Sequence, residues 1–384
     1  MKKFTLYLLF LCVLGLFPLA VFGQNSDATR KAAELLMQGK FKDAIAVLDK
    51  AVEKNKDLFE VYKLRAALKR MTGDFEGALS DLSAAIEQKA DDGEIYEQRA
   101  MMRLYTRRDK ALVLADLDAA LANGRKHEKV YSTRGSVKAQ LRDFEGAIAD
   151  YETAIGMRPE MAGAYLGLSS AYGMMRNEEK STEVLEKFVA MIENSNTKIG
   201  KVDGQVVATS DANKIPVMPG DKNSGTESTV IIQGSTTTGR RYSDGGSSNF
   251  NQRDTAFELE QKKNTAAVYS QLGMVYVRRG DYERASQLVE KSLAIDPQDF
   301  MALMTRGKIR TAQGNYAAAI ADLDASIKLM PNFSQVYLER GIAKLLSGNE
   351  AEAQKDFDKF IEFVPNGKTM VDYEIQKAKE RLEK

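Results

Sequence analysis

Residues 266–299 read AAVYSQLGMVYVRRGDYERASQLVEKSLAIDPQD, and this stretch carries the pattern that decides the fold. Apolar residues recur three or four positions apart on both sides of Gly280, which is the spacing of one face of an α-helix. Gly280 and Asp281 interrupt the periodicity, and Pro297 follows the second segment, where proline stops a helix. The stretch therefore predicts two amphipathic helices joined by a tight turn.

The same pattern repeats along the chain. Gly280, Gly314 and Gly348 are spaced 34 residues apart, and an alanine follows each of them five residues later. Because a fixed period of this length is typical of stacked helical repeats, we divide the chain into eight units of two helices each. The units are 25–58, 59–92, 93–127, 128–161, 162–195, 266–299, 300–333 and 334–367.

This pattern resembles the tetratricopeptide repeat family over nearly all of the chain outside the N-terminus and one insert. The sixth unit matches the family signature most fully, at Tyr269, Leu272, Gly273, Tyr276, Gly280, Tyr282, Ala285 and Pro297. Tyr or Leu replaces the usual leading Trp. The resemblance implies an all-α fold, an α–α superhelical solenoid whose concave face binds peptides. The Lys/Asn arrangement of chaperone-binding members is missing, since Ala67 rather than Asn follows Lys63.

Arginines in the first helix of a unit occur together with aspartates in the second helix. The pairs are Arg65 with Asp81, Arg99 with Asp116, Arg134 with Asp150, Arg306 with Asp322, and Arg340 with Asp356. Where the arginine position holds Leu168 or Leu272, the aspartate position holds Val184 or Leu288. Because the arginine and the aspartate of a unit are present or absent together, we predict structural ion pairs between them. The alternative is that these arginines bind a ligand.

The composition excludes several classes of function. With 55 Lys and Arg against 54 Asp and Glu, the net charge of +1 gives no basis for nucleic-acid binding. One Cys and one His do not suffice for an ordinary zinc site, and His127 lies in a charged linker without a catalytic constellation. We expect no metal, no cofactor and no catalytic residue.

Residues 1–23 resemble a secretory signal peptide. Lys2 and Lys3 precede an apolar run, and Gly23 offers a small residue at the cleavage position. The sequence therefore predicts export to a bacterial periplasm or envelope. The apolar stretch is about as long as the minimum for a membrane span, so an uncleaved anchor is the alternative and would be the one membrane contact.

Residues 196–265 lose the helical period and are rich in Gly, Ser, Thr and Asn, which predicts a flexible insert. Two weak strand signals lie within it, one around the Asp203-Gly204 turn and one at Thr229–Ile232. The alternative to a hairpin at Asp203-Gly204 is a flexible loop, because an isolated hairpin is only marginally stable in water. A flap that folds back on the repeats is the alternative role for the insert.

The helix before the insert is too apolar for an end of the array, so we expect one continuous superhelix from which the insert loops out. After the last unit, Val371, Ile375, Ala378 and Leu382 share one helical face, which predicts a capping helix. The predicted organisation is a signal peptide at 1–23, five units at 24–195, the insert at 196–265, three units at 266–367 and the capping helix at 368–384.

A second stripe on the first helices of the last two units is apolar, and the resemblance places it on the concave face. The predicted partner-binding residues are Met301, Met304, Lys308, Leu338, Ile342 and Leu345. An open apolar groove would accept a partner helix or extended peptide. The alternative is that the terminal helix or the insert already covers the stripe.

Together these observations predict a non-enzymatic scaffold in the cell envelope that binds a protein or peptide partner. A membrane-tethered structural subunit is the alternative function, and an enzyme is disfavoured because no catalytic constellation is present. Self-association of the repeats stays open.

Overall fold

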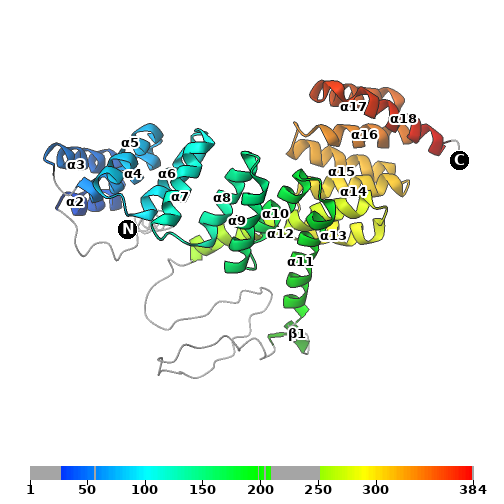
Figure 1. Cartoon of the computed structure of the whole chain (residues 1–384). Helices are drawn as coiled ribbons and strands as arrows, with labels where there is room; N and C mark the ends of the chain where they lie inside the picture. Colours follow the sequence, from blue (N-terminus) through cyan, green and yellow to red (C-terminus); the bar gives the residue numbers. More distant parts are fainter. Residues whose placement is uncertain (1–26, 56–57, 198, 203–204, 209–250, 383–384) are drawn as a thin grey trace.

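The computed structural model describes residues 27–55, 58–197, 199–202, 205–208 and 251–382. The predicted signal peptide at 1–23 and the strand signal at Thr229–Ile232 lie outside the described residues. Figure 1 shows helix pairs stacked side by side into a curved array that runs from α2 to α18.

Eight helix pairs form the described array, each with a first and a second helix. The five pairs before the insert are α2 (Asp27–Met37) with α3 (Phe41–Glu53), α4 (Leu58–Thr72) with α5 (Phe75–Gln88), α6 (Gly93–Tyr105) with α7 (Lys110–Ala122), α8 (Glu128–Gln140) with α9 (Phe144–Met157), and α10 (Ala162–Met174) with α11 (Glu178–Thr197). The three pairs after it are α12 (Asn251–Arg278) with α13 (Tyr282–Ile295), α14 (Phe300–Ala312) with α15 (Tyr316–Leu329), and α16 (Ser334–Leu346) with α17 (Glu350–Phe363). The predicted all-α solenoid is confirmed.

The turns within the units follow from local backbone chemistry. Gly280 has φ of +80°, in the left-handed region where a residue without a Cβ suffers no penalty. Asp281 then caps the next helix, because its Oδ1 accepts a hydrogen bond from the Arg284 N–H at 3.0 Å. Arg142 occupies the equivalent turn position with φ of +67°, so glycine is favoured there without being required.

Small residues let the two helices of a unit approach closely. The alanines that follow the turns are at most 1% exposed, namely Ala78, Ala147, Ala285, Ala319 and Ala353. A Cβ on Gly341 would lie 2.5 Å from Cε1 of Phe357, so a larger residue there would force the Phe357 ring or the helix that carries it to shift. The repeated small residues of the sequence are therefore contact points between helices.

The array is continuous across the insert. One apolar cluster joins Tyr165 and Phe188 of the fifth unit to Tyr269 and Leu288 of the sixth unit. The rings of Tyr165 and Phe188 lie 4.9 Å apart between centroids. Helix α12 packs against α10 and α11, so the fifth and sixth units are neighbours in space as well.

First helices of neighbouring units also pack against one another. Helix α8 contacts α10, α12 contacts α14, and α14 contacts α16. In a curved stack the elements on the inner side approach most closely. The first helices therefore line the inner face of the array, and the second helices form its outer face.

The boundaries of the insert differ from the predicted 196–265. Helix α12 begins at Asn251, fifteen residues before the expected start at 266, so 251–265 belong to a helix. This segment, NQRDTAFELEQKKNT, lacks Gly and Pro and contains good helix formers, but it is too polar to show an apolar period.

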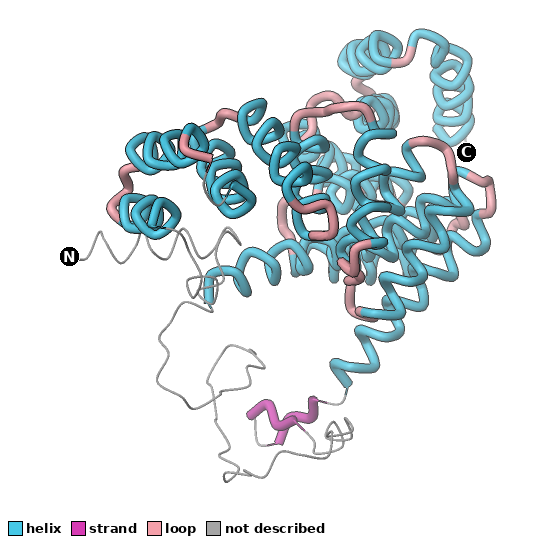
Figure 2. The backbone as a smooth tube through the Cα atoms, turned by 60° about the vertical axis from the view of Figure 1, so that its left-hand side comes forward, coloured by secondary structure: helices cyan, strands magenta, loops and turns pink. Residues whose placement is uncertain are grey.

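A small hairpin lies at the start of the insert. Strand β1 (Ile199–Val202) pairs antiparallel with β2 (Gln205–Ala208), and Val202 lies opposite Gln205. Figure 2 shows this hairpin beyond the end of α11, away from the stacked helices. The strands flank the predicted Asp203-Gly204 turn, whose two residues lie outside the described part.

Helix α18 (Lys368–Leu382) follows a short 3-10 turn (Pro365–Gly367) and closes the C-terminal end of the array. Val371 and Ala378 are each 2% exposed and belong to the same cluster as Leu338 and Phe357. The helix therefore covers the apolar side of the last unit, where a further repeat would otherwise pack. Across the described part of the chain, no helix is both long and apolar enough to cross a membrane.

Candidate functional site

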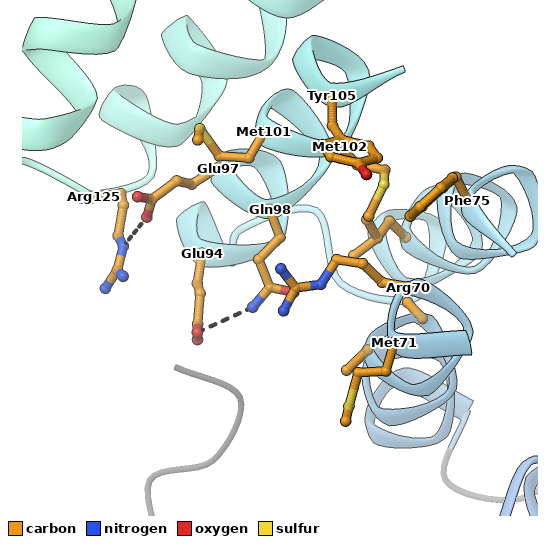
Figure 3. Close-up of a pocket in the computed structure, with 13 residues that line it drawn as sticks. Arg70, Met71, Phe75, Glu94, Glu97, Gln98, Met101, Met102, Tyr105 and Arg125 are labelled. Atoms are coloured by element: carbon orange, nitrogen blue, oxygen red, sulfur yellow. Dashed lines mark hydrogen bonds and ion pairs between the residues drawn. The ribbon is translucent and has the colours of Figure 1, made fainter. Parts of the chain in front are cut away.

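The array carries a pocket on its inner face between the first helices α4 and α6. Its volume is about 560 Å³, and the first half of α5 and the connection after α7 complete its walls. Figure 3 shows the labelled side chains converging on this space. We refer to it as the α4–α6 pocket.

One wall of the α4–α6 pocket is apolar. It consists of Ala66, Ala67, Met71, Phe75, Leu82, Met101, Met102 and Tyr105. Met101 is 50% exposed and Tyr105 is 68% exposed, although both are large apolar side chains. The ring of Phe75 lies 4.7 Å from that of Tyr105, so the aromatic part of the wall is held in place. Short side chains at Ala66 and Ala67 leave the space that the pocket occupies.

Most polar groups of the pocket satisfy one another. Glu97 on α6 accepts from Arg125 Nε at 2.6 Å and lies 3.2 Å from His127 Nε2. Glu94 accepts from Gln98 Nε2 at 3.2 Å and pairs with Lys63 Nζ at 3.3 Å. The two carboxylates are thereby engaged from α4, α6 and the linker after α7.

Arg70 on α4 is the exception. Its guanidinium extends into the pocket beside Gln98 (Figure 3), and no carboxylate among the described residues lies within ion-pair distance of it. Desolvation by the surrounding protein lowers the pKa of Arg70 from its ordinary value, and no anionic neighbour counters the effect. The first helices of the next three units hold Leu104, Ala139 and Gly173 at the equivalent position, so this arginine is particular to the pocket.

The five Arg–Asp pairs expected from the sequence are ion pairs in the structure. The Nη2–Oδ1 distances are 2.6 Å for Arg65–Asp81, 2.6 Å for Arg99–Asp116, 2.5 Å for Arg134–Asp150, 2.8 Å for Arg306–Asp322 and 2.5 Å for Arg340–Asp356. Each pair also has an Nε–Oδ contact, so the guanidinium binds the carboxylate through two nitrogens. These arginines face carboxylates of their own chain and leave no guanidinium open for a ligand.

The pairs belong to a larger arrangement that the sequence reading missed. Each aspartate also pairs with a cation four residues beyond its arginine, namely Lys69, Arg103, Lys138, Arg310 or Lys344. Four of the arginines reach back to the preceding unit, to Asp49, Asp118, Glu290 and Asp324. The hydrogen bond to Asp150 is the main cause that raises the pKa of Arg134. We call this arrangement the carboxylate ladder, and its repeated spacing was present in the sequence.

The predicted partner-binding stripe is not an open surface, which corrects the sequence-based expectation. Met304 is 4% exposed, Leu338 2%, Ile342 9% and Leu345 5%. Leu338, Ile342 and Leu345 lie in one cluster with Val371 and Ala378 of α18, so the terminal helix covers them. Met304 instead packs in the neighbouring cluster with Leu323 and Val336.

The two remaining residues of the stripe differ from the buried ones. Lys308 pairs with Glu339 at 2.6 Å, and Met301 is partly exposed on α14. Together they do not form a groove. The stripe is closed because α18 packs its own apolar face against α16. Burying the two apolar faces against each other removes both from water, which is favourable.

No metal site emerges from the described residues. No group of three or more His, Cys, Asp or Glu side chains among them is arranged to hold a metal ion. His127 contacts Glu97 at the edge of the α4–α6 pocket.

The comparisons with known proteins agree with this architecture. Sequence models described as tetratricopeptide repeat match residues 29–95, 133–172 and 272–338. A comparison with curated protein sequences finds no match.

A comparison with solved structures finds many matches. The APC/C hetero-tetramer Cut9–Hcn1 is 13% identical with a TM-score of 0.51, over 90% of this chain and 55% of that one. A tetratricopeptide repeat protein from Parabacteroides merdae is 15% identical with a TM-score of 0.48, over 83% of this chain and 97% of that one. The repeat matches and the stacked helix pairs together show that the chain contains tetratricopeptide repeats.

Proposed function

We propose that the protein is a non-enzymatic scaffold that binds a polypeptide partner in the α4–α6 pocket. The observation that carries the proposal is the combination of an exposed apolar wall and an unpaired arginine on the inner face of the array. Exposed apolar surface of this kind costs free energy in water unless a partner covers it. Tetratricopeptide repeats generally serve in protein–protein interaction, which supports the same function.

The pocket suits recognition better than chemistry. Its methionines adapt to different apolar side chains, and its tyrosine offers a rigid aromatic contact with a hydroxyl at the edge. Its carboxylates, Glu94 and Glu97, are held by neighbouring cations and an amide. These carboxylates face no Ser, Thr or Cys among the residues that line the pocket.

Site-specific photo-crosslinking in the native cells tests the proposal. A photoreactive amino acid at Met101 (50% exposed) should give a discrete adduct with a protein partner. The matched control is the same amino acid at Met157, which is 49% exposed on the second helix α9, outside the pocket. Adding Tyr105→Ala should weaken the adduct from position 101, because it removes an exposed part of the apolar wall.

Two outcomes would contradict the proposal. Equal adducts from positions 101 and 157 would show that contact is not confined to the pocket. No adduct from position 101 in cells that express the protein at its native level would show that the pocket stays free. In contrast, an adduct restricted to position 101 and sensitive to Tyr105→Ala would support partner binding there.

We also propose that the protein works outside the cytoplasm, in a bacterial envelope. The support is the basic start, apolar run and small Gly23 of residues 1–23. N-terminal sequencing of protein from fractionated cells tests this. A new N-terminus near Gln24 in the periplasmic fraction is expected; an intact N-terminus in the membrane fraction would select the tethered structural subunit, and protein in the cytoplasm would contradict both.

A further inference from the structure

We infer that the turns of the third, fourth and fifth units bind the surface of a phospholipid membrane that carries anionic headgroups. The inference goes beyond the proposed function, because it concerns the edge of the array where each first helix turns into its second helix. We call this surface the arginine edge, and it consists of Tyr105, Arg107, Leu141, Arg142, Met174 and Arg176.

Arginine occupies an unfavourable backbone position in each of these three turns. In all eight units, one residue of the turn between the two helices has positive φ, and it is glycine in five of them. In the third, fourth and fifth units it is Arg107, Arg142 and Arg176, at φ of +54°, +67° and +59°. A residue with a Cβ is disfavoured in this conformation, so the turn alone would favour glycine. The three arginines therefore point to a role for the guanidinium outside the turn.

The three guanidinium groups are open to a ligand. Each of these arginines is exposed, and none of them forms an ion pair with a carboxylate in the described part of the chain. The aspartates in two of the turns, Asp109 and Asp143, instead cap the next helices, each by accepting a hydrogen bond from a backbone N–H at 2.9 Å. The arginine edge thus differs from the carboxylate ladder, whose arginines are all bound to aspartates of the chain.

An exposed apolar side chain lies beside each of the three arginines. Tyr105 is 68% exposed, Leu141 42% and Met174 68%. Among the five turns with glycine, all of them described, only that of the first unit has an exposed large apolar residue at the corresponding positions, Met37. The three units after the insert hold Arg278-Arg279, Ala312-Gln313 and the buried Leu346 with Ser347 there. Each turn of the arginine edge therefore combines a cation with an apolar side chain.

This combination favours a membrane over other anionic partners. Glu145, Glu178 and Glu179 lie just after these turns, so the edge carries little net charge and would not attract a polyanion such as nucleic acid from a distance. Binding must then come from close contact of the apolar side chains and the guanidinium groups together. A phospholipid surface offers partners for both, since acyl chains accept the apolar tips and phosphate oxygens accept the N–H groups of arginine. Anionic headgroups strengthen the contact, because zwitterionic headgroups cancel part of the phosphate charge.

The shape of the arginine edge also fits a membrane surface. Successive first helices run in the same direction, and α8 packs against α10, so the turns of neighbouring units follow one another along one edge of the array. The side chains lie at the ends of helices, and of the six residues only Tyr105 lines the α4–α6 pocket. A peptide partner binds in a groove or along a sheet edge, whereas a membrane interface accepts single protruding side chains.

Site-specific fluorescence on lipid vesicles tests the inference with the full chain. An environment-sensitive dye is attached through Met174→Cys, in a chain whose own cysteine is replaced by Cys12→Ser. The matched control carries the dye through Met157→Cys, a residue that is 49% exposed at the end of α9, on the opposite edge. Vesicles of phosphatidylglycerol and phosphatidylcholine, with a nitroxide quencher on the acyl chains, should shift the emission of the dye at 174 to the blue and quench it. The dye at 157 should not respond, and residues 1–23 are present in both chains, so insertion of that segment alone cannot produce the difference.

Arginine variants of the chain labelled at position 174 test the charged contact. Arg142→Gln combined with Arg176→Gln should raise the lipid concentration for half-maximal response by about tenfold or more, since each arginine near an anionic surface contributes to binding. The matched control, Lys126→Gln combined with Lys328→Gln, removes the same charge from exposed positions outside these turns and should leave that concentration unchanged. Vesicles of phosphatidylcholine alone should require more lipid, and glycerol phosphate in solution should not compete.

Four outcomes would overturn the inference. Equal responses at 157 and 174 would show that membrane contact is not confined to the arginine edge. An unchanged lipid concentration in the arginine double variant would remove the arginines from the contact. Competition by glycerol phosphate would identify a free phosphate as the ligand, and no response to vesicles would leave the edge to another occupant, such as an acidic protein. The proposed pocket stands apart from all four outcomes, because these variants leave its lining residues unchanged.

Discussion

The carboxylate of Asp150 accepts from Arg134 and Lys138 while the residue is only 3% exposed. The Asp150→Asn variant would leave two cations without their shared counter-charge in a largely dry position. We expect it to lower the free energy of unfolding by about 3 kcal/mol, as breaking a buried ion pair does. Chemical denaturation measures the loss, and hydrogen exchange should place it in α8 and α9.

Asp118→Asn is the matched control for Asp150→Asn. Asp118 contacts the same arginine, through Arg134 Nη1 at 2.7 Å, but its side chain is 53% exposed. Water replaces such a contact readily, so the expected cost is below about 1 kcal/mol. Similar losses of unfolding free energy for the two variants would contradict the expectation that burial determines how much each ion pair of the carboxylate ladder contributes to stability.

Single residues also show what the sequence could and could not reveal. The Arg–Asp pairs were predictable because two residue types appear and disappear together at a fixed spacing. Arg70 differs from its repeat equivalents Leu104 and Ala139, a signal that was present in the sequence. Its importance could not be recognised, because an unpaired charge is identified only when all its neighbours are known.

For individual helices, the sequence predicts what local patterns determine and misses what depends on contacts with the rest of the fold. The paired helices follow from apolar periodicity, turn glycines and terminal prolines, which act locally. The early start of α12 at Asn251 could not be predicted, since the polar sequence of residues 251–265 shows no apolar period. Likewise, the burial of Leu338 and Leu345 depends on the direction in which α18 leaves the last unit.

The packing of α18 gives a prediction at this scale. Val371 is 2% exposed against the last unit, while its neighbour Met370 is 51% exposed. Val371→Asp would bury a charge without a partner, so we expect α18 to detach and α16 and α17 to exchange amide hydrogens faster. Met370→Asp should leave exchange unchanged. If the amides of α16 and α17 remain equally protected from exchange in the Val371→Asp variant, the capping role of α18 is contradicted.

We expect the contact between α11 and α12 to weaken at alkaline pH. Tyr276 is 4% exposed and donates its hydroxyl hydrogen bond to Glu186. Burial, followed by that hydrogen bond and the charge of Glu186, raises the pKa of Tyr276 to about 12. Because the folded state holds the phenol proton more tightly, its contribution to stability is fully present below the ordinary pKa of 10.0 and is lost between pH 10 and 12.

The Tyr276→Phe variant isolates this contribution. Its melting temperature should fall less steeply than that of the native chain between pH 10 and 12, and the two slopes should agree near pH 8. The difference between variants removes the effect of the other tyrosines, which titrate in both. Parallel curves over the whole range would contradict the assignment to Tyr276.

On the scale of the whole molecule, the carboxylate ladder is interrupted where the insert leaves the array. Leu168, Val184, Leu272 and Leu288 replace its charged residues in the fifth and sixth units. There the fifth and sixth units contact each other through the apolar cluster that includes Phe188, Tyr269 and Val289. The chain thus consists of two ladder segments joined by an apolar junction, and the coupling between the segments depends on that junction.

A cavity in the junction should therefore uncouple the two segments. Phe188 is 1% exposed, and Phe188→Ala removes a large side chain at a cost of about 4 kcal/mol. In a linear array whose units contact only their neighbours, a weakened interface splits one unfolding transition into two. We expect hydrogen exchange during urea denaturation to give separate midpoints for α2–α11 and α12–α18. Phe357→Ala, an equal truncation at a residue also 1% exposed in the last unit, should loosen only the C-terminal end. A single shared midpoint for Phe188→Ala would mean that contacts other than the apolar cluster couple the two segments.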